Sequence, residues 1–256
     1  MEIVTWNVNS IRARMPRFLP WLEEKRPEVV CLQETKVEDD KFPREPIEEL
    51  GYELAIDGQR TYNGVAILSR IGLEDVVAGF EGNLNPDQKR ALAATVGGDT
   101  RVLNLYVVNG HSVGSDKYAF KLAWLEALAE HVRTSYDMGE KVVLCGDFNI
   151  TFDDRDIYDP EEWRDKILCS QPERDALAKL MEPGLEDALR RFHEDTGPFT
   201  WWDFRTRGWR RDRGLRIDHF LCSRPAMDAC SGVHVDREAR DGEKPSDHAP
   251  VFASFG

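Results

Sequence analysis

Residues 141–149 read KVVLCGDFN, an apolar run followed at once by acidic and amide side chains. The run at 141–146 is apolar on both faces, as expected for a strand that is covered on both sides. Asp147 and Asn149 follow where this strand ends. Strand ends in α/β folds point loop side chains into one crevice, so we expect a functional site at this position.

Four other segments repeat this arrangement of an apolar strand beside polar side chains. They read WNVN at 6–9, LQETK at 32–36, LRIDH at 215–219 and SDHAP at 246–250. Taken alone, a carboxylate or an asparagine next to a strand is more often a turn residue or a helix cap. Five such segments in one chain favour a shared site.

The rest of the sequence combines strand-like runs with a few helical patterns. We expect strands at residues 2–6, 29–33, 52–56, 64–69, 91–96, 101–108, 141–146, 217–223, 232–235 and 251–255. Apolar spacing and stop signals predict helices at about 116–138 and 172–181, and a weaker one at 185–193. Pairs of strands between helices predict stacked sheets with outer helices. No repeat or linker divides the chain, so we expect a single domain over residues 1–256.

The composition argues against several classes of protein. No run approaches the ~18 apolar residues needed to span a bilayer, so no membrane contact is expected. The five cysteines form no CxxC pair, which argues against a zinc site and favours a reducing, cytoplasmic location. The chain has 34 Lys and Arg against 47 Asp and Glu, a net charge of −13. That balance argues against a protein that holds DNA by bulk charge.

The charge is nevertheless unevenly distributed. Residues 153–165 contain seven acids and two arginines, whereas residues 205–216 contain six arginines and one acid. A run of like charge is usually only a solvated face. Trp209 lies inside the basic segment, and rings beside arginines favour nucleic-acid binding, because rings stack on bases while the cations hold phosphates. We therefore expect a confined DNA footprint whose affinity falls as the salt concentration rises.

The polar side chains at the strand ends fit phosphate-ester hydrolysis. Glu34, with the amide oxygen of Asn7 and with Asp247, offers hard oxygen ligands suited to Mg²⁺ or Mn²⁺. A metal there would neutralise the phosphate and the leaving alkoxide. Asp147 would take a proton from water, and Asn149 would hold that water in line.

Asp218 and His248 complete this set. Asp218 would orient His248 and fix its tautomer, so that the other ring nitrogen donates to a phosphoryl oxygen. No serine or cysteine stands in a nucleophile elbow, so direct attack by water is the simpler mechanism.

These motifs resemble those of the exonuclease III type of apurinic/apyrimidinic (AP) endonuclease, in the endonuclease/exonuclease/phosphatase superfamily. The resemblance spans the chain and rests on NVN at 7–9, LQETK at 32–36, NGVA at 63–66, GDFN at 146–149, TWWDF at 200–204, GLRID at 214–218 and PSDHAP at 245–250. TYNGVAI at 61–67 and YDPEEW at 158–163 further resemble a bacterial branch that includes the neisserial AP endonuclease.

The resemblance implies a fold and an activity. The fold is a four-layered α/β sandwich of two stacked mixed sheets flanked by helices. The activity is Mg²⁺-dependent hydrolysis, with Mn²⁺ as a substitute metal, of the phosphodiester 5′ to an abasic site during base excision repair. Removal of 3′-blocking groups and 3′→5′ exonuclease action are common companions. The expected partner of this monomeric enzyme is double-stranded DNA with abasic sites or blocked 3′ ends, in a bacterium at the nucleoid.

The resemblance also implies roles for individual residues. Its metal site falls on Glu34, Asn7 and Asp247, and its hydrolytic pairs fall on Asp147 with Asn149 and on Asp218 with His248. Its active-site tyrosine falls on Tyr106, and Asn109 is the neighbouring phosphate contact. Whether Tyr106 or Asp147 activates the nucleophile stays open.

The expected DNA-contacting residues lie in the second half of the chain. The abasic-sugar pocket falls on Trp201, Leu215 and Ile217, where an apolar slot admits a flipped sugar without a base. Simple core packing is the alternative explanation for Ile217. Arg205 falls where relatives place a wedge into the DNA. Backbone phosphates would be held by Arg207, Arg210, Arg211 and Arg213.

Three segments depart from the family pattern. Residues 106–109 lack a proline often found there, residues 110–117 match poorly, and residues 209–212 are less acidic than in some relatives. They leave the ratio of AP cleavage to exonuclease activity open. Two rival functions are a superfamily hydrolase acting on phosphoinositides, sphingomyelin or an RNA tail, and a non-catalytic nucleic-acid-binding regulator. The arginine loop favours DNA over the first, and the complete set of carboxylates argues against the second.

Overall fold

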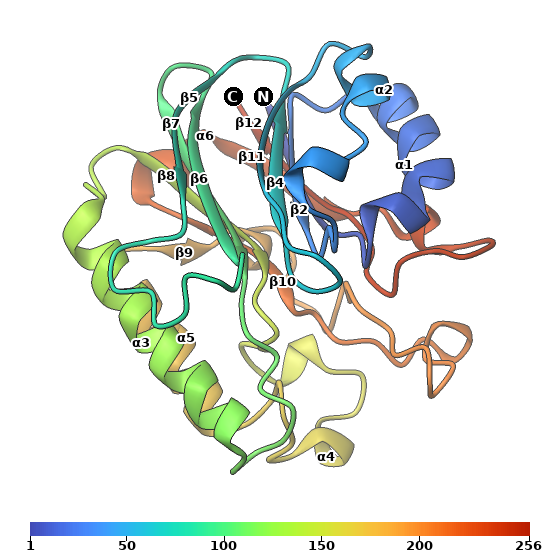
Figure 1. Cartoon of the computed structure of the whole chain (residues 1–256). Helices are drawn as coiled ribbons and strands as arrows, with labels where there is room; N and C mark the ends of the chain where they lie inside the picture. The colour runs from blue at the N-terminus through green and yellow to red at the C-terminus, as the bar shows by residue number, and fades with distance from the viewer.

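The computed structural model describes residues 1–256 and contains two six-stranded sheets (Figure 1). The first sheet has the strand order β11-β12-β1-β2-β4-β3, and the second has the order β5-β6-β7-β8-β10-β9. The strands of the first sheet are β1 (Glu2–Asn7), β2 (Val29–Gln33), β3 (Glu53–Asp57), β4 (Val65–Ser69), β11 (Cys230–Val235) and β12 (Val251–Phe255). Those of the second sheet are β5 (Leu73–Ala78), β6 (Ala91–Val96), β7 (Thr100–Tyr106), β8 (Lys141–Asp147), β9 (Glu186–Asp187) and β10 (Asp218–Cys222).

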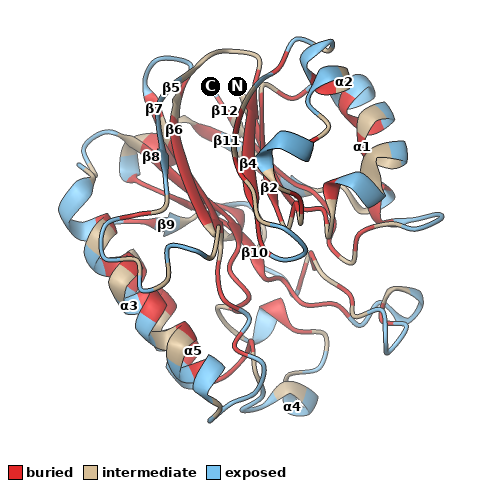
Figure 2. Cartoon of the chain, in the orientation of Figure 1, coloured by how far each residue is buried: buried red, intermediate tan, exposed pale blue.

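The sheets stack face to face and helices cover their outer faces, which gives four layers. The helices are α1 (Ile11–Lys25), α2 (Glu45–Glu48), α3 (Asp116–Ser135), α4 (Pro160–Trp163), α5 (Gln171–Met181) and α6 (Arg224–Ala229). One apolar core lies between the sheets, a second joins α1 and α2 to the first sheet, and a third joins α3 and α5 to the second sheet. Buried residues accordingly concentrate on the strands and on the inner sides of the helices (Figure 2). The four-layered sandwich is therefore confirmed.

Most of the expected elements are confirmed, and β2, β6 and β12 have the expected bounds. The helix at 116–138 ends earlier, at Ser135, because Tyr136 is extended. The helix expected at Leu185–His193 is wrong. Residues 186–187 form β9, and a single 3₁₀ turn follows at residues 189–191. Pairing of Asp187 with Leu221 of β10 overrides the local helical preference.

Five helices and strands have no counterpart among the expectations, namely α1, α2, α4, α6 and β5. Helix α1 contains Pro16 and Pro20, which hide its pattern, although Ile11, Phe18 and Leu22 form its buried side. Strand β5 is an exposed edge strand without apolar alternation. None of the helices has the length and the apolar content that crossing a membrane requires.

The pairing of strands brings the polar strand ends into register. Asn7 pairs with Gln33 across the parallel strands β1 and β2. In the second sheet Asp147 pairs with Tyr106 on one side and with Asp218 on the other. The strand ends that carry the expected site residues therefore lie side by side at one end of each sheet.

A buried hydrogen-bond bridge connects the two sheets below this end. Gln33 Nε2 donates to Asn104 Oδ1 at 2.7 Å, and Asn104 Nδ2 donates to the carbonyls of Leu32 and Ala66 at 2.9 and 2.8 Å.

Gly146 lies just before Asp147 with φ of 145°, and a Cβ there would lie 1.9 Å from the Leu105 carbonyl oxygen. Only glycine lets β8 approach β7 so closely at this point.

Candidate active site

Asn7 connects two carboxylates that come from different sheets. Its Nδ2 donates to Glu34 Oε1 and to Asp147 Oδ2, both at 2.9 Å. Its Oδ1 accepts from the backbone N–H of Asn9 at 3.0 Å. The predicted ligand oxygen of Asn7 thus points to its own loop, and the amide would have to turn before that oxygen faced Glu34.

Glu34 is held beside a cation. Lys36 Nζ lies 2.6 Å from Glu34 Oε2 and also donates to Asn9 Oδ1 at 2.6 Å. Burial raises the pKa of Glu34, but the charge of Lys36 and the hydrogen bond from Asn7 outweigh it, so the pKa lies below its ordinary value. Glu34 is therefore ionised at neutral pH. Asn9 and Lys36 lie within the sequence motifs at 6–9 and 32–36 but had no predicted role.

Asp247 lies on the far side of the same polar group. Its Oδ1 accepts from Asn9 Nδ2 at 2.9 Å, and its Oδ2 accepts from Trp201 Nε1 at 3.0 Å. Burial raises the pKa of Asp247, but the charge of His248 and these hydrogen bonds outweigh burial, so the pKa lies below its ordinary value. Asn9 therefore links Asp247 through Lys36 to Glu34.

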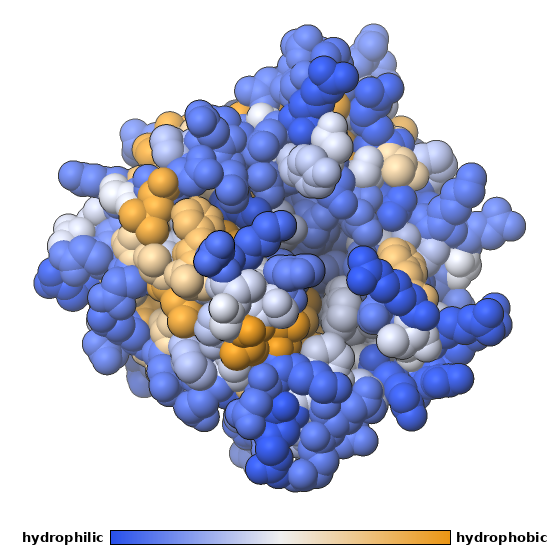
Figure 3. Space-filling model, turned by 60° about the horizontal axis from the view of Figure 1, so that its bottom comes forward, coloured by the Kyte–Doolittle hydropathy of each residue, from blue (hydrophilic) through white to orange (hydrophobic).

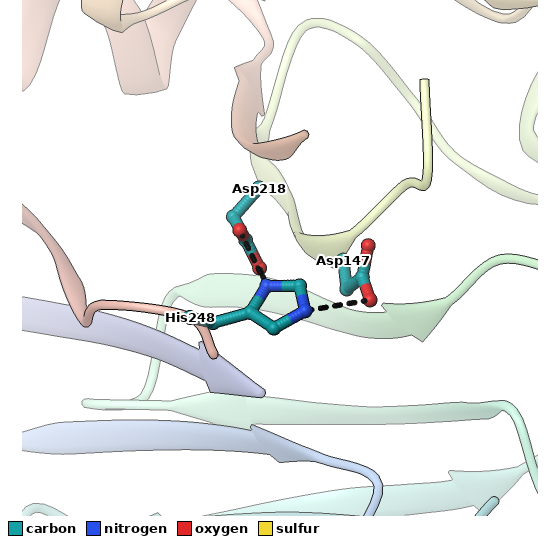
Figure 4. A group of neighbouring side chains, drawn as sticks. All are labelled: Asp147, Asp218 and His248. Atoms are coloured by element: carbon teal, nitrogen blue, oxygen red, sulfur yellow. Dashed lines mark hydrogen bonds and ion pairs between the residues drawn. The ribbon is translucent and has the colours of Figure 1, made fainter. Parts of the chain in front are cut away.

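Asp147, Asp218 and His248 form a compact group whose ligand atoms lie within 4.8 Å of one another (Figure 4). Both oxygens of Asp218 contact His248 Nδ1, at 3.1 and 2.9 Å, and His248 Nε2 lies 3.7 Å from Asp147 Oδ2. Thr200 Oγ1 donates to Asp218 Oδ2 at 2.6 Å and fixes that carboxylate. The expected orientation of His248 by Asp218 is thus present in the structure.

The two carboxylates around His248 change its acid–base behaviour. Burial lowers the pKa of His248, but the negative charges of Asp218 and Asp147 dominate and raise it to about 10. Burial raises the pKa of Asp147 to about 7; His248 lowers it and Asp218 raises it. A protonated imidazole donates hydrogen bonds and cannot ligate a metal. This group is therefore suited to moving protons, and metal binding by Glu34, Asn7 and Asp247 stays a prediction.

Asn149 follows Asp147 in a left-handed conformation, with φ of 52°. Its backbone N–H donates to Asp147 Oδ1 at 2.9 Å, and its Nδ2 donates to the Val107 carbonyl at 3.1 Å. Asn109 Nδ2 donates to Asn149 Oδ1 at 2.9 Å. The structure thus brings both predicted asparagines together beside Asp147.

Lys121 of α3 was not among the expected site residues. Its side chain is fully buried, and its Nζ donates to the carbonyls of Asn149 and Asn109 at 2.7 and 3.2 Å. The buried carboxylate of Glu173 neutralises it. A lysine on the apolar side of a long helix is the sequence signal that could have drawn attention to it.

Tyr106 stands between Glu34 and Arg90. The Arg90 guanidinium lies 4.7 Å from the ring centroid, and burial, together with the charges of Glu34 and Asp147, raises the pKa of Tyr106 well above its ordinary value. Glu34, Arg90, Tyr106 and Asn109 line one cleft of ≈ 490 Å³. The end of the molecule shown in Figure 3 is hollowed near its centre and bordered mostly by hydrophilic side chains. Sequence reasoning did not identify Arg90.

The three predicted sugar-pocket residues occur together but differ in exposure. Trp201 pairs through its backbone with Leu215 and is half-buried. Leu215 and Ile217 are 0% and 1% exposed and pack against Leu168 among other apolar residues. Leu215 and Ile217 form the packed base of this region, and their binding of a sugar stays a prediction.

The predicted arginine loop is on the surface. The exposed members are Arg205, Arg207, Arg210, Arg211 and Arg213. The sixth arginine of the basic segment, Arg216, is fully buried and pairs with Asp156 and Asp187, each at 2.7 Å. The basic and acidic segments therefore neutralise each other in part, and the surface charge of the loop is smaller than its composition indicates.

The residues present fit a divalent metal. Glu34 and Asp247 supply ionised carboxylates, and Asn7 supplies an amide oxygen once its side chain turns, so that all donors are the hard oxygens that Mg²⁺ prefers. The ammonium of Lys36 already occupies a cationic position 2.6 Å from Glu34. The carboxylate of Glu34 therefore attracts positive charge at this edge.

Comparison with known proteins places the whole chain among nucleases. The model of the Endonuclease/Exonuclease/phosphatase family matches residues 4–248. Exodeoxyribonuclease III of Haemophilus influenzae is 35% identical over 266 residues, which cover 100% of both chains. The structure of the 3′ phosphatase NExo from Neisseria, bound to a product DNA hairpin, is 44% identical with a TM-score of 0.95, covering 100% of this chain and 99% of that one.

An AP endonuclease from Archaeoglobus fulgidus is similar in structure to the same degree. It is 36% identical with a TM-score of 0.95, again covering 100% of this chain and 99% of that one. Similarity of sequence and structure thus extends over the whole chain, including the strand ends that carry Asn7, Glu34, Asp147 and His248. The chain belongs to the endonuclease/exonuclease/phosphatase family, in its exonuclease III and AP endonuclease branch.

Proposed function

We propose that this protein is a DNA-repair nuclease that hydrolyses the phosphodiester 5′ to an abasic site in duplex DNA with Mg²⁺ as its metal. We also propose that it removes 3′-blocking groups, including phosphate, and degrades DNA 3′→5′. The observation that carries the proposal is the buried group of Asp147, Asp218 and His248 next to Glu34 and Asn7. The proposal further rests on relatives with nuclease names that match over the full length.

The protein's own residues divide the chemistry between them. Asp147, with its pKa of about 7, accepts the proton of the attacking water, whose position Asn149 helps to define. The oxygen of that water forms the new bond to phosphorus, and the bond from phosphorus to the 3′ oxygen of the preceding nucleotide breaks. His248, held protonated by Asp218, donates to a phosphoryl oxygen and stabilises the developing negative charge.

Glu34, Asp247 and Asn7 would hold the metal, which supplies charge neutralisation of the phosphate and of the leaving oxygen. Tyr106 is the second candidate for activating the nucleophile. Its pKa well above the ordinary value keeps the phenol protonated, which favours a role as donor over a role as base. We propose Asp147 as the base for this reason.

The proposed substrate follows from the exposed arginines at the rim and from the DNA hairpin in the neisserial structure. Trp201 would border the abasic sugar, and Asn109 and the arginine loop would contact phosphates. We expect a monomer, since nothing in the site requires a second chain. In a bacterial cell it would act in the cytoplasm, at the nucleoid.

The test uses three labelled duplexes of the same sequence, one with a tetrahydrofuran abasic analogue, one with a 3′-phosphate and one intact. We expect Mg²⁺-dependent incision at the analogue and release of phosphate, both abolished by EDTA. Release of phosphate without incision would restrict the function to 3′ ends. No cleavage of any duplex, by a protein that binds DNA and melts cooperatively, would contradict the proposal.

A further inference from the structure

Arg240 carries a buried positive charge that no group of the protein pairs. It lies in a short 3₁₀ segment (Arg237–Arg240) and is only 4% exposed. Its Nε is buried without a hydrogen-bond acceptor, and no carboxylate forms an ion pair with its guanidinium. A guanidinium has five N–H donors, and a buried charge without a partner is costly.

Arg14, in the first turn of α1, is half-buried but resembles Arg240 in one respect. Its Nε is also buried without an acceptor. Burial lowers the pKa of both guanidiniums, and each of the two is acted on by the negative charge of Asp247. Both guanidiniums therefore lie within reach of the charge of Asp247.

The acids nearby are already engaged. Both oxygens of Asp247 accept hydrogen bonds, from Asn9 and Trp201. Asp241 Oδ1 accepts from the backbone N–H of Gly242 at 2.9 Å. Elsewhere in the chain a buried arginine such as Arg216 forms ion pairs with two carboxylates. No carboxylate of the protein therefore accepts a hydrogen bond from Arg14 or Arg240.

The segment that carries Arg240 is nevertheless held firmly. Arg17 of α1 donates to carbonyls of residues 239–243. The Arg240 guanidinium lies over the rings of Phe204 and Trp209, at 4.9 and 5.3 Å from their centroids. The segment, red in Figure 1, therefore lies between α1, which is blue, and the arginine loop, which is orange. Stacking on rings fixes the plane of a guanidinium and leaves the donors at its edge free.

We propose that Arg14 and Arg240 together bind one internucleotide phosphate of the DNA strand that passes Asp247. This inference rests on the proposed function, because it takes DNA as the ligand. A phosphodiester brings one negative charge and two free oxygens, which match the edge donors of paired guanidiniums. This subsite is separate from the arginines at 205–213, which are exposed, whereas Arg240 is buried before DNA arrives.

The test measures DNA binding in EDTA, where cleavage is suppressed. R240Q and R14Q are compared with the wild type, and R133Q serves as the control, because Arg133 is exposed on α3 and paired with Glu130. Fluorescence anisotropy follows binding of an abasic duplex from about 50 to about 400 mM KCl. We expect R240Q and R14Q each to weaken binding about ten-fold and to reduce the salt slope by about 1, while R133Q matches the wild type.

A second set of duplexes locates the phosphate. Each carries one uncharged methylphosphonate at a different position near the abasic analogue. In the wild type one position should weaken binding, and in R240Q and R14Q that same substitution should have a smaller effect, because only one of the two arginines remains to contact the phosphate. The inference is overturned if every position weakens both variants as it weakens the wild type, or if the salt slopes are equal.

The outcome for Arg240 is separable from the outcome for the proposed function. Wild-type incision in Mg²⁺ tests the function on the same duplexes, whatever the binding data show. Arg14 and Arg240 lie on different elements, so one variant still tests the subsite if the other fails to fold. A variant that loses DNA binding only because it misfolds would have a lower melting temperature. Its folded fraction would still respond to the methylphosphonates as the wild type does, and that result would contradict the subsite.

Discussion

Asp147 and Asp156 are both buried aspartates, with 1% and 0% of their surface exposed, and yet they behave in opposite ways. Burial raises the pKa of Asp147 to about 7, whereas the guanidiniums of Arg216 and Arg190 outweigh burial and lower the pKa of Asp156 to about 2. Asp156 belongs to a network in which each carboxylate has a guanidinium partner. Asp147 has other carboxylates around it and one imidazole at 3.7 Å.

The difference shows where charge stabilises the fold and where it is kept for chemistry. A balanced buried network fixes the segment from Asp156 to β9 and β10 and needs no ligand. The group around Asp147 and Glu34 keeps an excess of negative charge at a cleft, which is the environment that perturbs pKa values at functional sites. A metal and a phosphate, or protons, would complete it.

Asp147→Asn tests the chemical half of this comparison. It should lower the rate of incision by about 10²- to 10⁴-fold, because it removes the general base. The melting temperature should stay near that of the wild type. Single-turnover incision and thermal denaturation measure the two quantities. Near-normal turnover combined with a large loss of stability would show that Asp147 supports the fold and is not the general base.

Asp156→Asn tests the structural half. It leaves Arg216 buried with one of its partners neutral, so we expect a loss of about 3–5 kcal/mol in the free energy of unfolding. Urea denaturation measures this loss, and incision per folded molecule should be retained. A stable variant that cleaves slowly would show that the two networks are not separate.

His248→Asn removes the donor that faces the phosphoryl oxygen. We expect a loss of about 10²- to 10³-fold in turnover, as for other single donors that stabilise developing charge. Steady-state kinetics on the abasic duplex measures it, with Asp147→Asn as the reference. If turnover did not change, the pairing of His248 with Asp218 would have no catalytic meaning.

His219 lies beside the balanced network, and its burial predicts a pH dependence of stability. Burial lowers the pKa of His219 to about 4 from an ordinary value of 6.5, so below pH 6.5 the unfolded chain binds a proton that the folded chain does not. Stability should fall by about 3 kcal/mol as the pH drops from about 6.5 to about 4. Denaturation of the wild type and of His219→Gln across this range isolates the effect, and parallel curves would contradict it.

Much of the site could be predicted because its residues follow strands. Asp147, Glu34 and His248 are next to apolar runs whose ends must meet, and their residue types limit the chemistry. Lys121 and Arg240 could not be predicted in the same way. Lys121 finds its acceptors in segments far along the chain, and Arg240 finds none there. Spacing between residues in the sequence does not reveal such distant contacts.

The failed expectations have the same origin. Residues 185–193 have a helical composition, but Asp187 pairs with Leu221 of β10 and its carboxylate forms an ion pair with Arg216, which lies just before β10. Arg216 belongs to the basic segment 205–216 by composition, but it is buried, unlike the other arginines of that segment. Local pattern predicts an element until a charged partner elsewhere in the chain stabilises an alternative more strongly.

The bridge between Gln33 and Asn104 has a consequence for engineering. Its buried hydrogen bonds lock the alignment of the two sheets directly beneath the hydrolytic residues, and the loops at 203–213 and 237–244 lie outside that lock. Those loops can therefore be exchanged with the corresponding segments of relatives to alter which DNA ends or lesions are accepted. The geometry of the catalytic residues would stay the same after such an exchange. Substrate preference could then be changed without changing the rate of hydrolysis.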